Sequence, residues 1–382
     1  MEELKEELLQ CRRCGVCRNA VYEAKGFDGI CPVWRNTSGF ETSFMRGKIQ
    51  VALALLDGEL EKTAEMGESL YQCTLCGNCT QICGAEFHPA HVMETVRTVL
   101  SDLPNQSRDH IIASLQETSN PYDEDPSKKR EWLSDLGFEV STTGETLYFV
   151  GCTAALRVPR IAKQTAMILN ASKTGFAVME NEPCCGSVMM RIGKLDEARA
   201  NAEQVATAIA STGAKRVVVT CAGCLKTLRN DYPEKFGIVL PEVLHIIEYA
   251  NQLIGSEDLR IIPLQEDITV TYHDPCHMGR ELEIYEEPRN LLRAIPGITL
   301  IEMNPNRNAA ICCGAGGGLR SFDPALSKKI AADRILSAEE THAEAIVTTC
   351  PFCEHNLQSG AELLGSKMQV LDVVDLLMKA IE

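Results

Sequence analysis

The sequence predicts an α+β multidomain fold, in which an N-terminal all-α module precedes two tandem α/β domains with parallel sheets. Two observations carry this prediction. The first hundred residues alternate cysteine groups with helical patterns, whereas the rest of the chain alternates short apolar strands with helices, and it does so twice with a similar cysteine order. We therefore divide the chain into a helical module (1–105), a linker (106–144) and two α/β domains (145–255 and 256–382).

Composition restricts the class of protein. The net charge of −16 argues against a nucleic-acid partner, because phosphates require a basic surface. The first residues indicate a charged amphipathic helix and no signal peptide, so we expect the 18 cysteines to serve an intracellular chain as metal ligands. The longest apolar run, Val51 to Leu56, is far short of a membrane span, which excludes direct membrane insertion.

The helical module is predicted from apolar residues at helical spacing. We expect helices over residues 1–10, with Leu4, Leu8 and Leu9 on one side, over 46–60, and after Pro89. The cysteine groups lie between these helices, which is the arrangement of a ferredoxin-like module with two clusters.

Cysteine triplets in this module have the spacing that binds [4Fe–4S] clusters. Each triplet reads C-x2-C-x2-C, and in such proteins the fourth cysteine ligates the other cluster. We therefore predict two crossed ligand sets, Cys11, Cys14, Cys17 and Cys83 for one cluster and Cys73, Cys76, Cys79 and Cys31 for the other. Thirteen residues separate Cys17 from Cys31, a longer gap than the compact spacing has. Two zinc sites are the alternative, which the triplets disfavour because zinc ribbons use pairs.

The polar segment 106–144 contains a cluster of helix-breaking residues, Asn120 to Pro126, so we expect a linker with a short helix around Ile111 to Leu115. Beyond it, the pattern predicts strands at 147–150, 176–179 and 217–219, with helices around 161–169 and 198–210 between them. The second copy repeats this with strands at 268–272, 298–301 and 346–347 and helices around 291–293 and 326–336. Strands that alternate with helices form parallel sheets.

Each α/β domain carries five cysteines, here called the first and the second pentad. In both, a single cysteine is followed after 31 or 35 residues by a Cys-Cys pair, and after 35 or 36 more by C-x-x-C. The first pentad is Cys152, Cys184, Cys185, Cys221 and Cys224, and the second is Cys276, Cys312, Cys313, Cys350 and Cys353. Several of these follow predicted strands, so we expect each pentad to converge at the carboxyl edge of its sheet. A cubane needs four thiolates, so the fifth either joins a larger or opened cluster, acts as a redox thiol, or is a spare buried cysteine.

The second pentad has the more permissive surroundings. Its Cys-Cys pair is followed by four glycines, Gly314, Gly316, Gly317 and Gly318. We interpret them as leaving room for a ligand near the cluster. His273 and His277 flank Cys276 and are either proton donors or supports for the sulfur ligands. Arg280 and Arg320 are candidates for holding an anionic substrate group, against the alternative of surface ion pairs. We therefore predict that the substrate meets the second pentad.

On these motifs the chain resembles the heterodisulfide reductase family, specifically its D-type subunits. The resemblance rests on all 18 cysteines, on the His273 to Arg280 segment and on the Cys312 to Gly318 segment. It implies two [4Fe–4S] cubanes in the helical module and one iron–sulfur cluster, cubane or noncubane, in each cysteine-rich ("CCG") domain. The positions that match the family's cluster ligands are the two pentads. Of these we predict Cys276, Cys312, Cys313, Cys350 and Cys353 to be catalytic, with His273 and His277.

The resemblance implies a cytoplasmic oxidoreductase subunit of methanogenesis type that reduces a small-molecule disulfide such as CoM-S-S-CoB. Its electrons would come from a partner, either a membrane cytochrome b or a soluble flavoprotein, which would make the chain peripheral to the cytoplasmic membrane. The same architecture also serves as the electron-transfer subunit of flavin-linked glycolate, lactate or glycerol-3-phosphate dehydrogenases. Two intact pentads favour the disulfide-reducing function.

Overall fold

Helices build the first hundred residues of the computed structural model, which describes all residues except 20, 23–26, 86, 135 and 382. The main helices of this module are α1 (Glu2–Leu9), α4 (Met45–Asp57), α5 (Ala64–Tyr71) and α7 (Pro89–Val99). The shorter ones are α2 (Val16–Asn19), α3 (Pro32–Arg35), η2 (Glu41–Ser43) and α6 (Asn78–Ile82). The predicted helical module is confirmed, and the long gap between Cys17 and Cys31 additionally holds a small hairpin of β1 (Val21–Tyr22) and β2 (Phe27–Asp28).

Apolar side chains from the helices hold this module together. Leu4 and Leu8 of α1 are buried with Ile49 and Leu53 of α4 and Val96 of α7 in one cluster. Leu9, predicted to share that face, is instead 62% exposed, because it ends the helix one residue beyond the buried stripe.

The segment 106–144 is packed against the neighbouring domain. It contains α8 (Gln106–Thr118) and a 3₁₀ helix, η3 (Pro126–Leu133), so its helix is longer than predicted. Ile111, Ile112 and Leu115 join the core that contains the first pentad, and Trp132 joins the second large core. This burial fixes a segment whose sequence reads as polar.

The first α/β domain contains a parallel three-stranded sheet in the order β3-β4-β5. Its elements are β3 (Thr146–Phe149), α9 (Cys152–Leu156), α10 (Pro159–Ala171), α11 (Ser187–Arg191), α12 (Leu195–Ser211), β4 (Arg216–Val219), α13 (Ala222–Lys226), a π-helix η4 (Thr227–Phe236), β5 (Glu242–His245) and α14 (Ile246–Gly255). The predicted strand at 176–179 is wrong, since Ala177 alone pairs there, in isolated bridges to Leu147 and Ser141. The chain turns away after two backbone hydrogen bonds between Ala177 and β3, toward the Cys-Cys pair.

The second α/β domain has a parallel four-stranded sheet in the order β7-β6-β8-β9. Its elements are β6 (Ile268–Tyr272), α15 (Glu286–Ala294), β7 (Ile298–Leu300), η5 (Arg307–Ala309), α16 (Leu319–Phe322), α17 (Pro324–Glu339), β8 (Ala345–Thr348), α18 (Pro351–Leu364), β9 (Gln369–Asp372) and α19 (Val373–Lys379). Here the strand beside β6 is complete, so the two sheets share one strand order, with Ala177 in the place of β7. The predicted fold class is confirmed.

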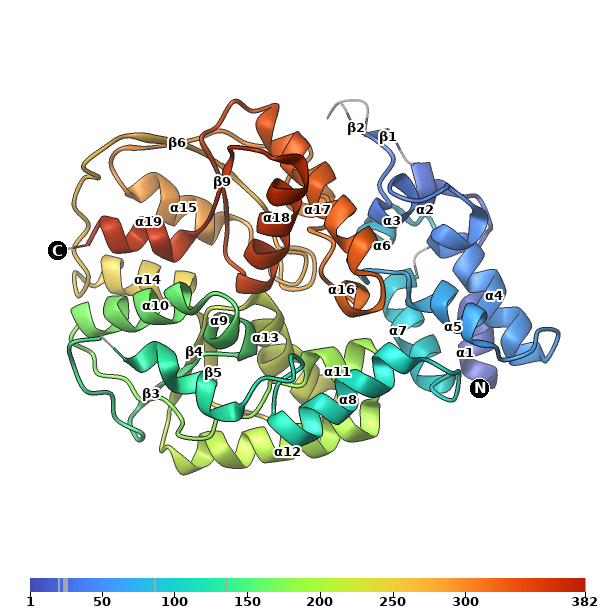
Figure 1. The fold of residues 1–382 in the computed structure, drawn as a ribbon, viewed down its shortest axis with the longest axis horizontal. Helices are drawn as coiled ribbons and strands as arrows, with labels where there is room; N and C mark the ends of the chain where they lie inside the picture. The colour runs from blue at the N-terminus through green and yellow to red at the C-terminus, as the bar shows by residue number, and fades with distance from the viewer. Residues whose placement is uncertain (20, 23–26, 86, 135, 382) are drawn as a thin grey trace.

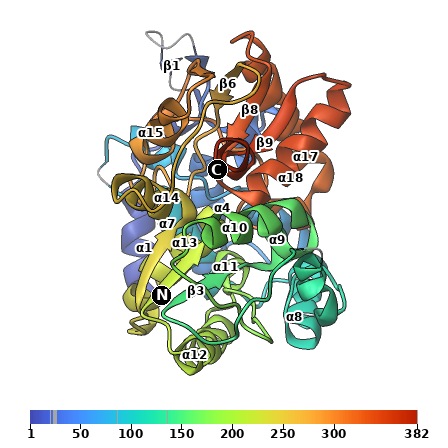
Figure 2. The same ribbon diagram turned by 90° about the vertical axis from the view of Figure 1, so that its left-hand side faces the viewer.

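The two α/β domains pack through equivalent helices, as Figures 1 and 2 show for α10, α14, α15 and α19. Helix α10 of the first domain contacts α19 of the second, and α14 contacts α15. Because α10 corresponds to α15 and α14 to α19 in the repeat, these two contacts are reciprocal, as in a two-fold dimer. The duplicated halves therefore meet around a pseudo-two-fold axis. In Figure 1 the helical module lies at the far side of both domains from the C-terminus.

Candidate functional site

The cysteines of the helical module line two separate cavities. Cys11, Cys14, Cys17 and Cys83 line one of about 340 Å³, together with Arg46. Cys31, Cys73, Cys76 and Cys79 line the other, where Cys17 reaches its edge. The grouping matches the predicted crossed sets, with Cys83 beside the first triplet and Cys31 beside the second.

Without a nearby cation, several of these buried thiols do not readily ionise to thiolates. Burial raises the pKa of Cys17 and of Cys31 to about 12. Because a cluster binds the thiolate and not the thiol, iron supplies the positive charge that such buried groups need. No cysteine of the chain is in a disulfide, and all eighteen lie in the described residues.

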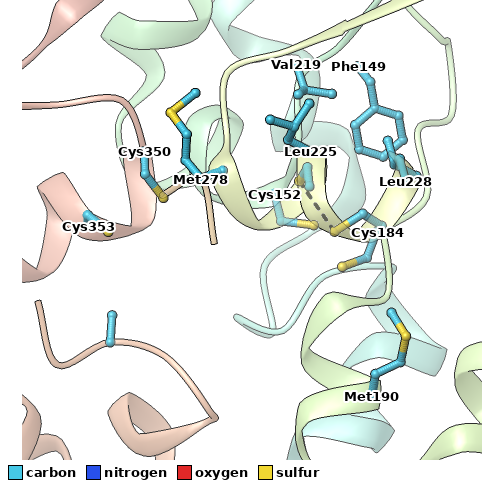
Figure 3. Close-up of a cluster of buried hydrophobic side chains, with 14 of the residues drawn as sticks. Phe149, Cys152, Cys184, Met190, Val219, Leu225, Leu228, Met278, Cys350 and Cys353 are labelled. Atoms are coloured by element: carbon cyan, nitrogen blue, oxygen red, sulfur yellow. Dashed lines mark hydrogen bonds between the residues drawn. The ribbon is translucent and has the colours of Figure 1, made fainter. Parts of the chain in front are cut away.

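Both pentads line one shared cavity of about 380 Å³ between the α/β domains. Each pentad contributes at least four of its thiols to the lining, with Cys312 alone remaining behind it. Figure 3 shows Cys350 and Cys353 on one side of this region and Cys152 and Cys184 on the other, with Met278 between them. The sulfurs of Cys224 and Cys185 are 3.4 Å apart in the first pentad, and those of Cys313 and Cys353 are 3.3 Å apart in the second.

The pseudo-two-fold axis explains why the pentads meet. Cys221 and Cys350 are the first cysteines of the two C-x-x-C motifs, and their sulfurs lie 4.0 Å apart. Equivalent residues approach each other only close to a symmetry axis. Sequence analysis favoured the second pentad as the site that meets a substrate, whereas the geometry gives both pentads equal access to the cavity.

The second pentad also adjoins the helical module. The thiol of Cys76 lies within hydrogen-bonding reach of Cys312. Cys312 is 2% exposed and in turn neighbours Cys276 and Cys313. Thiols therefore follow one another from the second cavity of the module through the second pentad to the first.

Two of the glycines after Cys313 lie against the backbone of the helical module. A Cβ on Gly317, whose φ is +61°, would lie 2.4 Å from the carbonyl oxygen of Cys73, and one on Gly316 would lie 2.7 Å from that of Thr74. Gly314 and Gly318, both with positive φ, would meet Ile330 and Phe322 instead. Three of the four, Gly316 to Gly318, line the cavity, and backbone contacts give Gly316 and Gly317 a packing reason for lacking a side chain. That these glycines also leave room for a ligand stays a prediction.

Arg280 does not hold a substrate group, contrary to the prediction. Its guanidinium donates to the carbonyl oxygens of Cys76 at 2.5 Å, Ala310 at 2.7 Å and Asn308 at 3.2 Å, and it does not line the cavity. It connects the second domain to the loop that carries Cys76.

Arg320 does line the cavity, and its described partners are neutral. It donates to Asn356, to His355 at 2.9 Å and to Ser359 at 3.4 Å. The other two arginines of the cavity are neutralised, Arg191 by Glu94 and Asp231 and Arg157 by Glu124. Arg320 is therefore the cavity arginine that has no carboxylate partner among the described residues.

The two predicted histidines occupy different environments. His277 lines the cavity. Burial and the charge of Arg191 lower its pKa to about 4, so the ring is neutral at pH 7 and does not carry the extra proton of an imidazolium acid. His273 is buried behind the pentad and does not line the cavity, which corrects its predicted catalytic role. Its Nδ1 accepts a hydrogen bond from Arg334 Nε at 3.3 Å.

Sequence analysis missed Arg97, which joins all three parts of the chain. This fully buried side chain donates to the carbonyl oxygens of Leu70, Tyr71, Cys73, Arg191 and Gly317, at 2.6 to 3.1 Å. Its one signal is position, because it lies four residues after Met93 and three before Leu100, on the apolar face of α7.

Comparisons with known proteins agree with this geometry. Residues 7–87 match the 4Fe-4S dicluster domain family, and residues 146–229 and 270–358 each match the cysteine-rich domain family. The D-type subunit of the dihydromethanophenazine:CoB–CoM heterodisulfide reductase of Methanosarcina barkeri is 32% identical, over 98% of this chain and 94% of the relative. The B-type subunit of the fumarate reductase (CoM/CoB) of Methanothermobacter marburgensis is 28% identical, over 91% of this chain and 69% of its own. The EtfAB:quinone oxidoreductase of Syntrophomonas wolfei is 27% identical, over 82% and 47% respectively.

Among solved structures, a hypothetical protein from Helicobacter pylori shares the fold. It superposes with a TM-score of 0.57 at 9% identity, covering 90% of this chain and 69% of that one.

The two matched domain families show that iron–sulfur clusters are the cofactors, and the thiol-lined cavities fit such clusters by donor type and number. Within the described residues, every helix is too short or too polar to cross a bilayer.

Proposed function

The chain belongs to the family of heterodisulfide reductase D-type subunits, which are iron–sulfur oxidoreductase subunits, and from this membership we propose that it reduces a small anionic disulfide between its two pentads. The reaction takes up two electrons and two protons, breaks the S–S bond and releases two thiols. When bound, the clusters supply these electrons one at a time. The disulfide of coenzyme M and coenzyme B, named for the relatives, is the first substrate to test.

The shared cavity is the observation that carries this proposal. A disulfide presents two bonded sulfur atoms that must each be reduced to a thiol, and a cavity lined by two sets of thiols offers a cluster site to each of them. The 4.0 Å approach of Cys221 to Cys350 supports two adjacent cluster sites, close enough for one S–S unit to contact both. A chain that only relays electrons needs no such cavity.

Arg320 supports a negatively charged substrate. A cation whose neighbours in the cavity are amide, hydroxyl and neutral imidazole groups is available for a sulfonate, phosphate or carboxylate. Burial, with the charges of Arg320 and Arg157, lowers the pKa of His355 to about 4, so His355 does not add a second positive charge there at pH 7. Arg320 would therefore fix the orientation of the substrate at one end.

We propose that electrons enter through Cys14. It is the one exposed cysteine of the eighteen, and the exposed Arg12 and Arg13 precede it directly. From the cluster of Cys14 the electrons would pass to the second cubane, whose ligand Cys76 neighbours Cys312 of the second pentad. The contact between Cys350 and Cys221 then connects the second pentad to the first. A membrane cytochrome b or a soluble flavoprotein would dock at this face, the former making the chain peripheral to the cytoplasmic membrane.

Anaerobic purification followed by iron analysis and a disulfide assay tests the proposal. With reduced viologen as donor, the cluster-loaded protein should convert the coenzyme M–coenzyme B disulfide to its two thiols. Cys221→Ser and Cys350→Ser should both abolish turnover, while the cubane EPR signals of the helical module in the same samples stay unchanged. If the loaded protein accepts electrons from a reduced flavoprotein but never cleaves a disulfide, the electron-transfer role of flavin-linked dehydrogenases is the correct one.

A further inference from the structure

Three buried nitrogen atoms that carry protons have no hydrogen-bond partner around the second pentad. They are His273 Nε2, Arg280 Nη2 and Arg334 Nη2, on side chains that are between 0% and 9% exposed. In the first α/β domain, the corresponding unpaired side-chain atoms of the described residues are Gln164 Oε1 and Thr165 Oγ1, both on α10. An unpaired buried donor costs roughly 1–3 kcal/mol. Three such donors in one place indicate an acceptor that the polypeptide itself does not provide.

The histidine and one of the two arginines lie close to the sulfurs of the second pentad. A ring nitrogen of His273 and the sulfurs of Cys313 and Cys353 are within 4.8 Å of one another. The Arg280 guanidinium interacts electrostatically with the thiols of Cys276 and Cys312. Arg334 reaches the pentad through His273, to which it donates a hydrogen bond at 3.3 Å.

The position of the proton on His273 follows from Arg334. A guanidinium nitrogen is always a donor, so the 3.3 Å bond from Arg334 Nε requires Nδ1 of His273 to be the acceptor. The ring proton is then on Nε2, which has no well-aligned partner, and the side chain within reach of His273 is the Cys313 thiol. Arg334 is itself held by a bond from Nη1 to the carbonyl oxygen of Pro305 at 3.3 Å.

We propose that His273, oriented by Arg334, donates its Nε2 proton in a hydrogen bond to a sulfur atom of the second-pentad cluster, and that His273, Arg280 and Arg334 together raise the reduction potential of this cluster. A donor or a positive charge near the sulfurs stabilises the reduced cluster more than the oxidised one, because the reduced cluster is more negative. His273 is a positioning and tuning residue that does not touch the substrate.

The first pentad is built without this set. Phe149 stands three residues before Cys152, where His273 stands three residues before Cys276, and it is fully buried. An aromatic hydrocarbon cannot donate a hydrogen bond. The two pentads are thus related by pseudo-symmetry but differ in their hydrogen-bond donors. The second has a histidine donor beside its sulfurs, whereas the cation near Cys152, Cys184 and Cys224 of the first, Lys129, is paired with Glu182. The inference rests on the cluster ligation proposed above and is independent of the identity of the substrate.

Redox titration of the loaded protein, followed by EPR without substrate, tests this. His273→Phe, which copies the first pentad, should keep its iron and lower the midpoint potential of one pentad signal, while the cubane potentials in the same sample stay unchanged. Arg334→Met should shift the same signal in the same direction. An unchanged potential in both loaded variants would overturn the inference, whereas wild-type protein without iron in its pentads would instead refute the ligation.

A second measurement on wild-type protein covers the case in which a variant loses its cluster. Protein labelled with ¹⁵N-histidine should show a nitrogen coupling to one pentad signal in pulsed EPR. The coupling should persist in His277→Phe, because that ring lines the cavity and is not one of the three unpaired donors. Absence of any histidine coupling in the loaded wild type would rule out the proposed bond.

Discussion

Replacing Gly317 by alanine separates two explanations of the glycine-rich loop. If the glycines exist to admit the substrate, the variant should be stable and bind substrate poorly. If they exist because the loop lies on the backbone of the helical module, the variant should be unstable. The matched control is Gly365→Ala, since Gly365 has nearly the same φ, +65° against +61°, but has no neighbouring atom within 4 Å of the position that an added Cβ would take.

The two substitutions share one cost and differ in another. An L-residue in the left-handed region costs roughly 1–2 kcal/mol in either position. At 317 the new Cβ would lie 2.4 Å from Cys73 O, where ordinary contact begins at 3.4 Å, so the loop must move by about 1 Å. Overpacking of this kind adds about 1–3 kcal/mol. At about 2 °C per kcal/mol for a protein of this size, Gly365→Ala should lower the apparent melting temperature by about 2–4 °C and Gly317→Ala by about 4–10 °C.

The assay is anaerobic thermal unfolding of both loaded variants, with iron analysis and Michaelis–Menten constants for the disulfide. Movement of the loop also threatens the bonds that Arg97 makes to Gly317 and Cys73, at 2.6 and 3.0 Å, so Gly317→Ala should lose iron as well as stability. Equal melting temperatures for the two variants, combined with a raised KM for Gly317→Ala alone, would refute the packing explanation and restore the one based on substrate access.

Three further substitutions test the site. Arg97→Met leaves five carbonyl oxygens without their donor and should lower the free energy of unfolding by roughly 3–5 kcal/mol. A loss of about 3 kcal/mol corresponds to about hundredfold faster amide exchange in residues 70–77 and 314–318. Unchanged exchange would contradict the role of Arg97. Cys83→Ser should remove the cluster bound by Cys11, Cys14 and Cys17, seen as about four irons lost and one cubane EPR signal missing; loss of the cluster of Cys73 instead would disprove crossed ligation. Arg320→Gln should raise KM for an anionic disulfide roughly 10- to 100-fold, the value of one charged hydrogen bond, and leave a neutral disulfide unaffected; Arg157→Gln is the control, because Glu124 already pairs with that guanidinium, and equal effects of the two would count against Arg320.

The cysteines by themselves determined the cofactors and the division of the chain into helical and α/β parts. A cluster needs thiolates at short, regular spacing. Because that requirement is local, the motifs C-x2-C-x2-C and C-x-x-C can be recognised as cluster ligands without knowledge of the fold. The strands Thr146–Phe149 and Ala345–Thr348 were equally predictable, because buried parallel strands are short continuous apolar runs. The strand predicted at 176–179 failed because nothing local shows that the chain leaves the sheet after one bridge.

Tertiary structure alone decided how these parts face one another. That Cys221 meets Cys350 and Cys76 meets Cys312 depends on a pseudo-two-fold packing of helices and on the docking of a module hundreds of residues away. The glycines at 316 and 317 looked like room for a substrate, since sequence records the absence of a side chain and not the neighbour that forbids one. Arg280 looked like an anchor for a substrate anion, and Arg97 and Arg334 gave no clear signal in the sequence. Burial makes all three donors to carbonyl oxygens. Spacing along the chain specifies ligands, whereas the electrostatic environment of those ligands is set by residues distant in sequence.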